Sequence, residues 1–229
     1  MQDADLKLLV RAVHRWLSFQ RMCGRSMMFS ESYLTQPIAE FVSTHHSGII
    51  VPELNHPQFA KSVVGRPKQV DFALLTRHSD KIECVIESKW VRDESYSKQA
   101  ILDDLLRLEC FRDKGHVRRY FLAAGLRQHF ERNFLNLRYR DGVDLPFLTE
   151  LLNPVLGSKT KTVYVQSAQG NLRRFYRKFQ SAYEVELPKT FRTKLVARSR
   201  IDGIAVYLWQ IESVQNRRTF DTTDWRNAT

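Results

Sequence analysis

Residues 70–91 read VDFALLTRHSDKIECVIESKWV, two apolar runs separated by the polar turn RHSD. Apolar runs of this length, bounded by turn residues, predict two buried strands, over residues 70–76 and 81–91. The first run has a carboxylate, Asp71, at its head, and the second ends in Glu87, Ser88 and Lys89. Because charge is costly to bury, these side chains need either partners or a function.

The short turn predicts that the two strands pair as a hairpin, so that the start of the first lies beside the end of the second. Side chains alternate along a strand, which puts Glu87 and Lys89 on one face, with Asp71 next to Glu87. Neighbouring carboxylates raise each other's pKa unless a cation holds them together, and hard oxygen ligands suit Mg²⁺, with Mn²⁺ as a substitute, better than zinc. We therefore expect Asp71, Glu87 and Ser88 to bind the metal and Lys89 to act on the attacking water. The plain alternative is an ion-pair cluster at a sheet edge, with Lys89 blunting that edge.

The other apolar patterns predict an α/β layered domain. We expect helices over residues 5–21, from a Ser30 cap to about residue 41, 96–111, 126–137 and 172–183. Further strands are expected over residues 49–53, 119–124, 162–166, 194–199 and 203–211. Pro37 is expected to delay or kink the start of the second helix. In the third helix, Asp103 and Arg107 are spaced as a surface ion pair.

These motifs resemble the PD-(D/E)xK nuclease superfamily, which has the restriction-endonuclease-like fold. Asp71 matches the family's aspartate, and after fifteen residues Glu87-Ser88-Lys89, the one E-x-K triplet in the chain, matches its (D/E)xK. A glutamate on the preceding helix commonly completes that site, and Glu31 matches it best, with Glu40 and Glu53 as rivals. The likeness spans roughly residues 30–124 and includes the order helix, three strands, helix, strand. It departs from the family in two places, because Val70 rather than a proline precedes Asp71 and because Gln99 is followed four residues later by Asp103 instead of tyrosine.

The resemblance implies an α/β fold with a restriction-endonuclease-like core, a central mixed β-sheet flanked by helices, followed here by a basic C-terminal α+β extension. It also implies a Mg²⁺-dependent endonuclease that hydrolyses DNA in restriction or phage defence, transposition or repair. In that enzyme Asp71, Glu87, Lys89 and Glu31 are the catalytic residues. Two alternatives stay open: an inactive nucleic-acid-binding or assembly module with the same fold, and a nuclease that acts on RNA.

The charge of the chain also points to a polyanion. The formal net charge is +11 and the pI is about 9.8. Residues 157–220 hold 13 basic and 4 acidic side chains, a net charge of +9, so the excess lies toward the C-terminal end. DNA is therefore the expected partner, although a solubilising surface is the simpler explanation of the charge. The expected phosphate contacts are Lys98, Gln99, Arg173, Arg174, Arg177 and Lys178.

Domain organisation and location follow from simpler features. We expect a nuclease core with its N-terminal helix over residues 1–156 and a basic region over residues 157–229, either separate or part of the same domain. No run of eighteen apolar residues occurs, and charges interrupt the apolar positions at the N-terminus, so neither a membrane span nor a signal peptide is expected and the location should be cytoplasmic. Cys84 and Cys110 lie in apolar runs and should be buried thiols. A homodimer or a larger nucleoprotein complex is compatible with these features.

Overall fold

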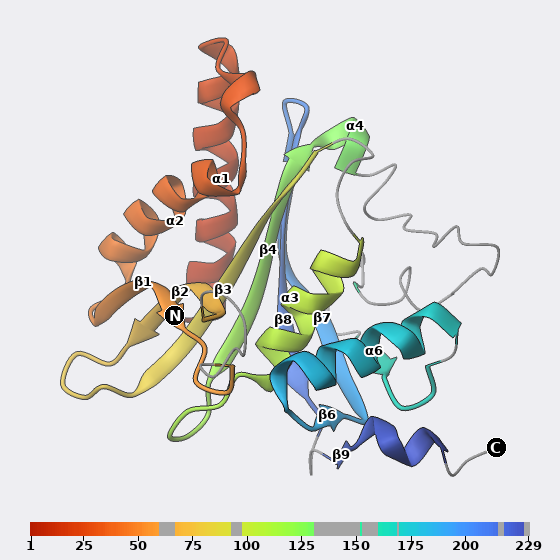
Figure 1. The fold of residues 1–229 in the computed structure, drawn as a ribbon. Helices are drawn as coiled ribbons and strands as arrows, with labels where there is room; N and C mark the ends of the chain where they lie inside the picture. Colours follow the sequence, from red (N-terminus) through yellow and green to blue (C-terminus); the bar gives the residue numbers. More distant parts are fainter. Residues whose placement is uncertain are drawn as a thin grey trace.

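The computed structural model describes residues 1–59, 67–92, 98–130, 152, 160–168, 170–214 and 218–226. Within these ranges the chain forms a mixed seven-stranded sheet with helices on both faces (Figure 1). The strand order is β1-β2-β3-β4-β8-β7-β5. The strands are β1 (Ile49–Asn55), β2 (Gln69–Leu75), β3 (Ile82–Val91), β4 (Arg118–Leu126), β5 (Lys161–Tyr164), β7 (Thr190–Ile201) and β8 (Ile204–Ser213). A small second sheet pairs β6 (Leu187–Pro188) with β9 (Thr219–Phe220).

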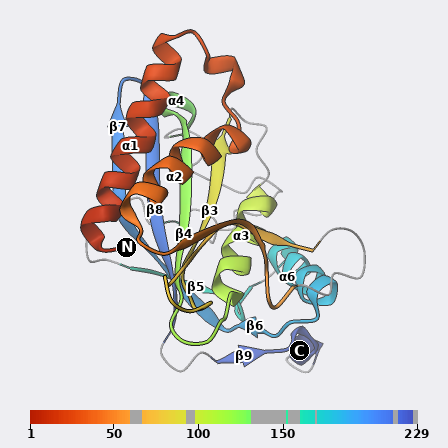
Figure 2. The ribbon, with the colours of Figure 1, turned by 90° about the vertical axis from the view of Figure 1, so that its left-hand side faces the viewer.

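Helices α1 and α2 cover one face of the sheet, and α3 and α6 cover the other (Figure 2). The helical segments are α1 (Asp3–Met22), η1 (Ser26–Met28), α2 (Glu31–His45), α3 (Lys98–Cys110), α4 (Arg127–His129), α6 (Gly170–Tyr183) and η3 (Thr222–Arg226). The Ser30 hydroxyl accepts a hydrogen bond from the Tyr33 N–H at 3.3 Å, so Ser30 is the N-cap of α2, as predicted. Pro37 lies inside α2, which already begins at Glu31, so the expected delay of the helix start was wrong.

The sheet separates two apolar cores because neighbouring residues of its strands point to opposite faces. On β3, Cys84, Ile86 and Trp90 face the α1–α2 side, whereas Val85 and Val91 face the α3–α6 side. The positions between Val85 and Val91 on this second face are Glu87 and Lys89. Two charged side chains therefore stand where the pattern of the strand would place apolar ones.

The antiparallel pairing places the start of β2 beside the end of β3. Strands β1, β2 and β3 form an antiparallel meander, and α3 then crosses over so that β4 pairs parallel to β3. This helix lies over the same face as Glu87 and Lys89. The crossover is what brings polar groups of α3 to the end of β3.

The C-terminal part of the chain joins the same sheet. Strand β8 pairs antiparallel with β4 and with β7, and β5 pairs with β7. Tyr207 and Trp209 of β8 are fully buried. Residues after 156 thus contribute three strands to the sheet, rather than standing apart from it.

Most predicted elements are confirmed with bounds that agree within about four residues. The predicted helix over residues 126–137 is described only as far as α4 and Phe130, and its remainder lies outside the described residues. Cys84 and Cys110 are buried as expected, and Cys23 is exposed.

Candidate active site

Asp71 and Glu87 occupy neighbouring positions on β2 and β3. The two strands pair with Phe72 opposite Ile86, so the next pair along the ladder is Asp71 and Glu87, as the sequence predicts. Asp71 Oδ2 accepts hydrogen bonds from the Ser88 N–H at 2.7 Å and from the Ser88 hydroxyl at 2.6 Å. Burial raises the pKa of Asp71, while these two hydrogen bonds oppose the rise. Ser88 therefore fixes the orientation of the Asp71 carboxylate.

Glu87 is a buried carboxylate with one paired and one unpaired oxygen. The residue is 7% exposed, and Oε1 accepts a hydrogen bond from Arg107 Nη2 at 2.8 Å. Oε2 is buried and has no hydrogen-bond partner among the residues that the structure describes. Burial is the main cause of a pKa well above the usual range, Arg107 opposes it, and the negative charges of Asp71 and Asp104 add to it. This oxygen is therefore the side-chain atom of Glu87 with which a bound cation would satisfy an unpaired acceptor.

Lys89 connects helices from the two faces of the sheet. Its ammonium lies 2.9 Å from Glu31 Oε1 on α2 and 3.0 Å from Asp104 Oδ2 on α3. Burial of Lys89 works against its charge, but the two carboxylates outweigh that effect and raise its pKa. Lys89 is therefore a fixed cation at the end of β3.

Arg107 holds the α3 side of this cluster. It pairs with Glu87, with Asp104 and, at 3.0 Å, with Asp103, and it donates a further hydrogen bond to the Gln69 carbonyl at 2.8 Å. The Asp103–Arg107 pair exists, but the prediction that it lies on the surface was wrong, because Arg107 is only 7% exposed. Its guanidinium is buried where α3 meets β2 and β3.

The sequence patterns predicted neither the role of Asp104 in this cluster nor the inward position of Arg107. Asp104 is three residues after Ile101 and four before Leu108, so it lies on the apolar stripe of the helix. An acid within an apolar stripe is a signal for a buried polar partner. The partner, Lys89, comes from a different element.

The cluster carries an excess of negative charge. Five carboxyl groups (Glu31, Asp71, Glu87, Asp103 and Asp104) face two cations (Lys89 and Arg107), which leaves a formal charge of −3 when all are ionised. Carboxylate oxygens, an unpaired buried Glu87 Oε2 and this excess charge fit a hard divalent cation. Among the described residues, no three His, Cys, Asp or Glu side chains are already arranged as a ligand set. In this arrangement Arg107 and Lys89 form ion pairs with some of the carboxylate oxygens that a metal would need.

The remaining predicted site residues lie at different places. Glu40 is exposed and accepts a hydrogen bond from Gln36 at 2.9 Å, and Glu53 is exposed on β1. Of the three glutamates considered for the fourth position, Glu31 is the one that contacts Lys89. Gln99 is exposed in the first turn of α3, and Lys98 begins that helix with a side chain outside the described part.

The basic residues of α6 do not form one uniform surface. The guanidinium groups of Arg173 and Arg177 lie 5.1 and 5.9 Å from the ring centre of Trp225, and Arg173 also donates to the Trp225 carbonyl. Arg174 and Lys178, four residues apart, are exposed. Of the four predicted phosphate contacts on α6, Arg173 and Arg177 are therefore engaged with the C-terminal segment, and Arg174 and Lys178 face solvent.

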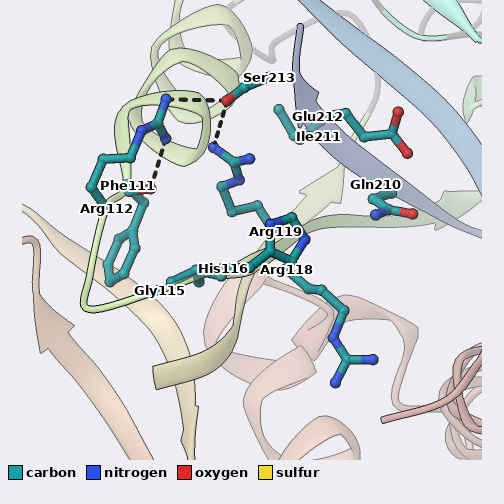
Figure 3. Close-up of a pocket in the computed structure, with 11 residues that line it drawn as sticks. Phe111, Arg112, Gly115, His116, Arg118, Arg119, Gln210, Ile211, Glu212 and Ser213 are labelled. Atoms are coloured by element: carbon teal, nitrogen blue, oxygen red, sulfur yellow. Dashed lines mark hydrogen bonds between the residues drawn. The ribbon is translucent and has the colours of Figure 1, made fainter. Parts of the chain in front are cut away.

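A second polar cluster lies at the opposite end of β4 and lines a pocket (Figure 3). Arg112 and Arg119 converge there on the Ser213 hydroxyl at 3.1 and 3.0 Å, and Ser213 donates to the buried Glu109 at 2.9 Å. Arg112 also pairs with Glu109 at 2.9 Å. Because protein acceptors already bind both guanidinium groups, we interpret this cluster as a structural link between α3 and β8.

Comparison of the chain with protein-family models, with curated proteins and with solved structures finds no significant match. None of the helices in the described ranges is both long and apolar enough to cross a membrane. The cluster at the end of β3 and the positive charge of the chain are therefore the features that bear on function.

Proposed function

We propose that this protein is a divalent-cation-dependent nuclease that cleaves DNA, with a restriction-endonuclease-like fold. The observation that carries the proposal is the buried pair Asp71 and Glu87 beside Lys89, in a cluster with excess negative charge. The order α2, β1-β2-β3 meander, α3 and parallel β4 supports it, because the resemblance of the motifs implies that order.

The roles of the residues follow from their contacts. Asp71, oriented by Ser88, and Glu87, through its unpaired Oε2, would hold Mg²⁺ or Mn²⁺. A cation held there acts as a Lewis acid and lowers the pKa of bound water. Lys89, fixed by Glu31 and Asp104, would orient the water or offset charge that develops on the phosphate. Arg107 keeps Glu87 in place.

Nuclease assays with linear, supercoiled, branched and single-stranded DNA, and with RNA, test the proposal. With Mg²⁺ or Mn²⁺ the wild type should cleave DNA, and Glu87→Gln should reduce the rate by at least about 100-fold because a ligand of the cation is lost. Glu83→Gln is the matched control, since Glu83 is on the same strand and outside the cluster. Equal cleavage by Glu87→Gln and wild type would remove the assignment, and cleavage of RNA alone would change the substrate.

One observation favours a second function. Glu87 and Lys89 already form close ion pairs, an arrangement that a structural cluster without catalysis would also have. In that case the chain is a nucleic-acid-binding or assembly module with the same fold. Binding of DNA without cleavage of any substrate in either cation would favour this module.

A further inference from the structure

The connection between α1 and α2 carries exposed apolar side chains. Phe19, Met22, Met27 and Met28 are 55, 79, 95 and 59% exposed. We call these four residues the apolar tip. Phe19 and Met22 are one helical turn apart at the end of α1, and Met27 and Met28 lie in η1. Apolar side chains gathered in this way on a surface mark a contact site more often than chance exposure.

The backbone under the apolar tip is held in one conformation. The buried Gln20 accepts hydrogen bonds from the Arg25 N–H at 3.0 Å on its carbonyl and from the Arg25 guanidinium at 2.9 Å on its side chain. Tyr33 of α2 donates to the same side-chain oxygen at 3.1 Å. Phe29, directly after η1, packs against the Tyr33 and Trp90 rings at 5.5 and 5.1 Å. Met27 and Met28 therefore project from a fixed base.

The apolar tip lies beside the candidate active site. Met28 is three residues before Glu31, which is at most about 11 Å of extended chain, and Glu31 contacts Lys89. The Phe29 carbonyl also accepts a hydrogen bond from Arg92, just beyond β3, at 3.4 Å. Figures 1 and 2 both show the α1–α2 connection at the end of the sheet where β3 and β4 finish. A polymer bound at the candidate site would run past η1.

The charge around the apolar tip selects the kind of polymer. Residues 6–30 contain five basic side chains and no acidic one. The exposed arginines Arg15, Arg21 and Arg25 flank the tip. Arg11 and Arg15 line a groove with Phe19, Met22 and Ile201, and Asp202 is its one acidic lining residue among those described. A second copy of this chain would bring like charges together, whereas a polyanion would neutralise them. Apolar and basic side chains side by side fit a nucleic acid duplex, with phosphates on the arginines and bases on the apolar groups.

We propose that Met27 and Met28 act as a wedge that enters a base step of duplex DNA bound at the candidate active site. The inference rests on the proposed function, because the duplex must reach the end of β3. Apolar wedges of this type part neighbouring bases and kink the duplex. The kink would expose the backbone next to Asp71 and Glu87, while the exposed Arg15 and Arg25 contact the flanking phosphates.

An unwinding assay tests the wedge without knowledge of the sequence that is bound. The Glu87→Gln protein, without divalent cation, is added to relaxed closed circular DNA with a topoisomerase that needs no metal. Because a wedge unwinds the duplex, the DNA should be negatively supercoiled after the protein is removed. When the substitutions Met27→Ala and Met28→Ala are combined with Glu87→Gln, most of the negative supercoiling should disappear and DNA binding should weaken about tenfold. Ile49→Ala, which removes another exposed apolar side chain at the β1 edge, should change neither.

The outcomes separate the wedge from the proposed function. The wedge is overturned if the double methionine variant unwinds DNA as much as its parent does. It is also overturned if the parent binds DNA without unwinding it. Neither result affects the nuclease assay. Self-association of the wild type that the double variant loses, seen by sedimentation, assigns the tip to a second copy. Binding of the tip to anionic vesicles but not to DNA overturns the proposal in favour of a lipid surface. If Glu87→Gln cleaves DNA as fast as the wild type, the proposed function is contradicted, but the unwinding result still stands.

Discussion

At the level of single residues, burial of the charged cluster at the end of β3 disfavours folding. A buried ion pair contributes little net stability, because removal of its charges from water offsets their attraction. Here Asp71, Glu87 and Asp103 have pKa values that burial raises, so their ionised forms are disfavoured in the folded state. Apolar side chains at Glu87 and Asp104 would complete the α3–α6 core at lower cost. The retention of charge is easier to explain by a role in binding or catalysis.

Replacement of Lys89 distinguishes an active site from an ion-pair cluster. Lys89→Met removes the cation that faces Glu31 and Asp104, so without metal the free energy of unfolding should fall by about 2–4 kcal/mol. Millimolar Mg²⁺ should restore most of this loss, because a cation that binds only the native state stabilises it. The cleavage rate should still be at least about 100-fold lower. Thermal unfolding with and without Mg²⁺ measures the first two effects.

Lys81→Met is the matched control, since Lys81 is exposed beside the turn between β2 and β3. It should alter neither the unfolding midpoint nor the response to Mg²⁺. If Lys89→Met is destabilised and Mg²⁺ gives no recovery, Lys89 is simply the counterion of a structural cluster.

His56 predicts a pH dependence of stability. The ring is fully buried, its Nε2 lies 2.8 Å from the Arg107 carbonyl, and its Nδ1 lies 3.2 Å from the Gln58 N–H, which suits the neutral form protonated at Nε2. Burial lowers the pKa of His56 to about 4. Between pH 6.5 and 4 the unfolded chain therefore binds a proton that the folded chain does not, so this residue makes stability fall as the pH falls, by up to about 3 kcal/mol.

The measurement is urea unfolding of wild type and His56→Gln from pH 7 to pH 4. Carboxylates with raised pKa values act in the opposite direction, because the folded state holds their protons and loses that stability as the pH rises. They are present in both proteins, so the difference between the two curves isolates His56. An identical pH slope in wild type and variant would contradict a neutral buried His56.

At the level of elements, α6 divides its basic residues between two roles. Arg174 and Lys178 face solvent, so replacing both with Gln should lower the slope of log affinity against log salt by about 2 if each contacts a phosphate. Arg173→Gln should leave this slope almost unchanged and lower the unfolding free energy by about 1 kcal/mol, because its guanidinium binds Trp225. Salt titrations of DNA binding check both. An unchanged slope in the double variant would show that α6 faces away from the DNA.

The elements were largely predictable because their patterns are local. The Ser30 cap, the apolar stripe of α1 and the RHSD turn each act within a few residues, and the hairpin register then places Asp71 beside Glu87. Asp104 and Arg107 could not be placed in the same way. Their contacts with β3 depend on the crossover of α3, a tertiary arrangement that periodicity within the helix does not report.

At the level of the whole molecule, the sheet unites the two halves of the sequence. A local pattern shows that β7 and β8 form a hairpin, but it does not show that β8 pairs with β4, about 80 residues earlier in the chain. The charge distribution predicts a basic region over residues 157–229 but leaves open whether it is separate or part of the same domain. In the structure these residues place Tyr207 and Trp209 in the core beside Phe121 and Phe130.

A fragment that ends at residue 156 should therefore not fold cooperatively. It would leave β4 without β8 and would remove Trp209, Tyr207 and Phe191 from the core. We expect weak near-ultraviolet circular dichroism and strong binding of a hydrophobic dye from the fragment. A sharp thermal transition in the fragment would show that residues 1–156 are a domain in their own right.

Titration with a divalent cation tests the proposed site at Asp71 and Glu87. Mn²⁺ titrated into the wild type near pH 7.5, and followed by electron paramagnetic resonance, should bind, and Glu83→Gln should bind equally well. Asp71→Asn and Glu87→Gln should each weaken binding by at least about tenfold, because even changes outside the ligand set alter metal affinity by that amount. The proposed metal site is contradicted if the wild type binds no Mn²⁺ at millimolar concentration, or if both carboxylate variants bind it as the wild type does.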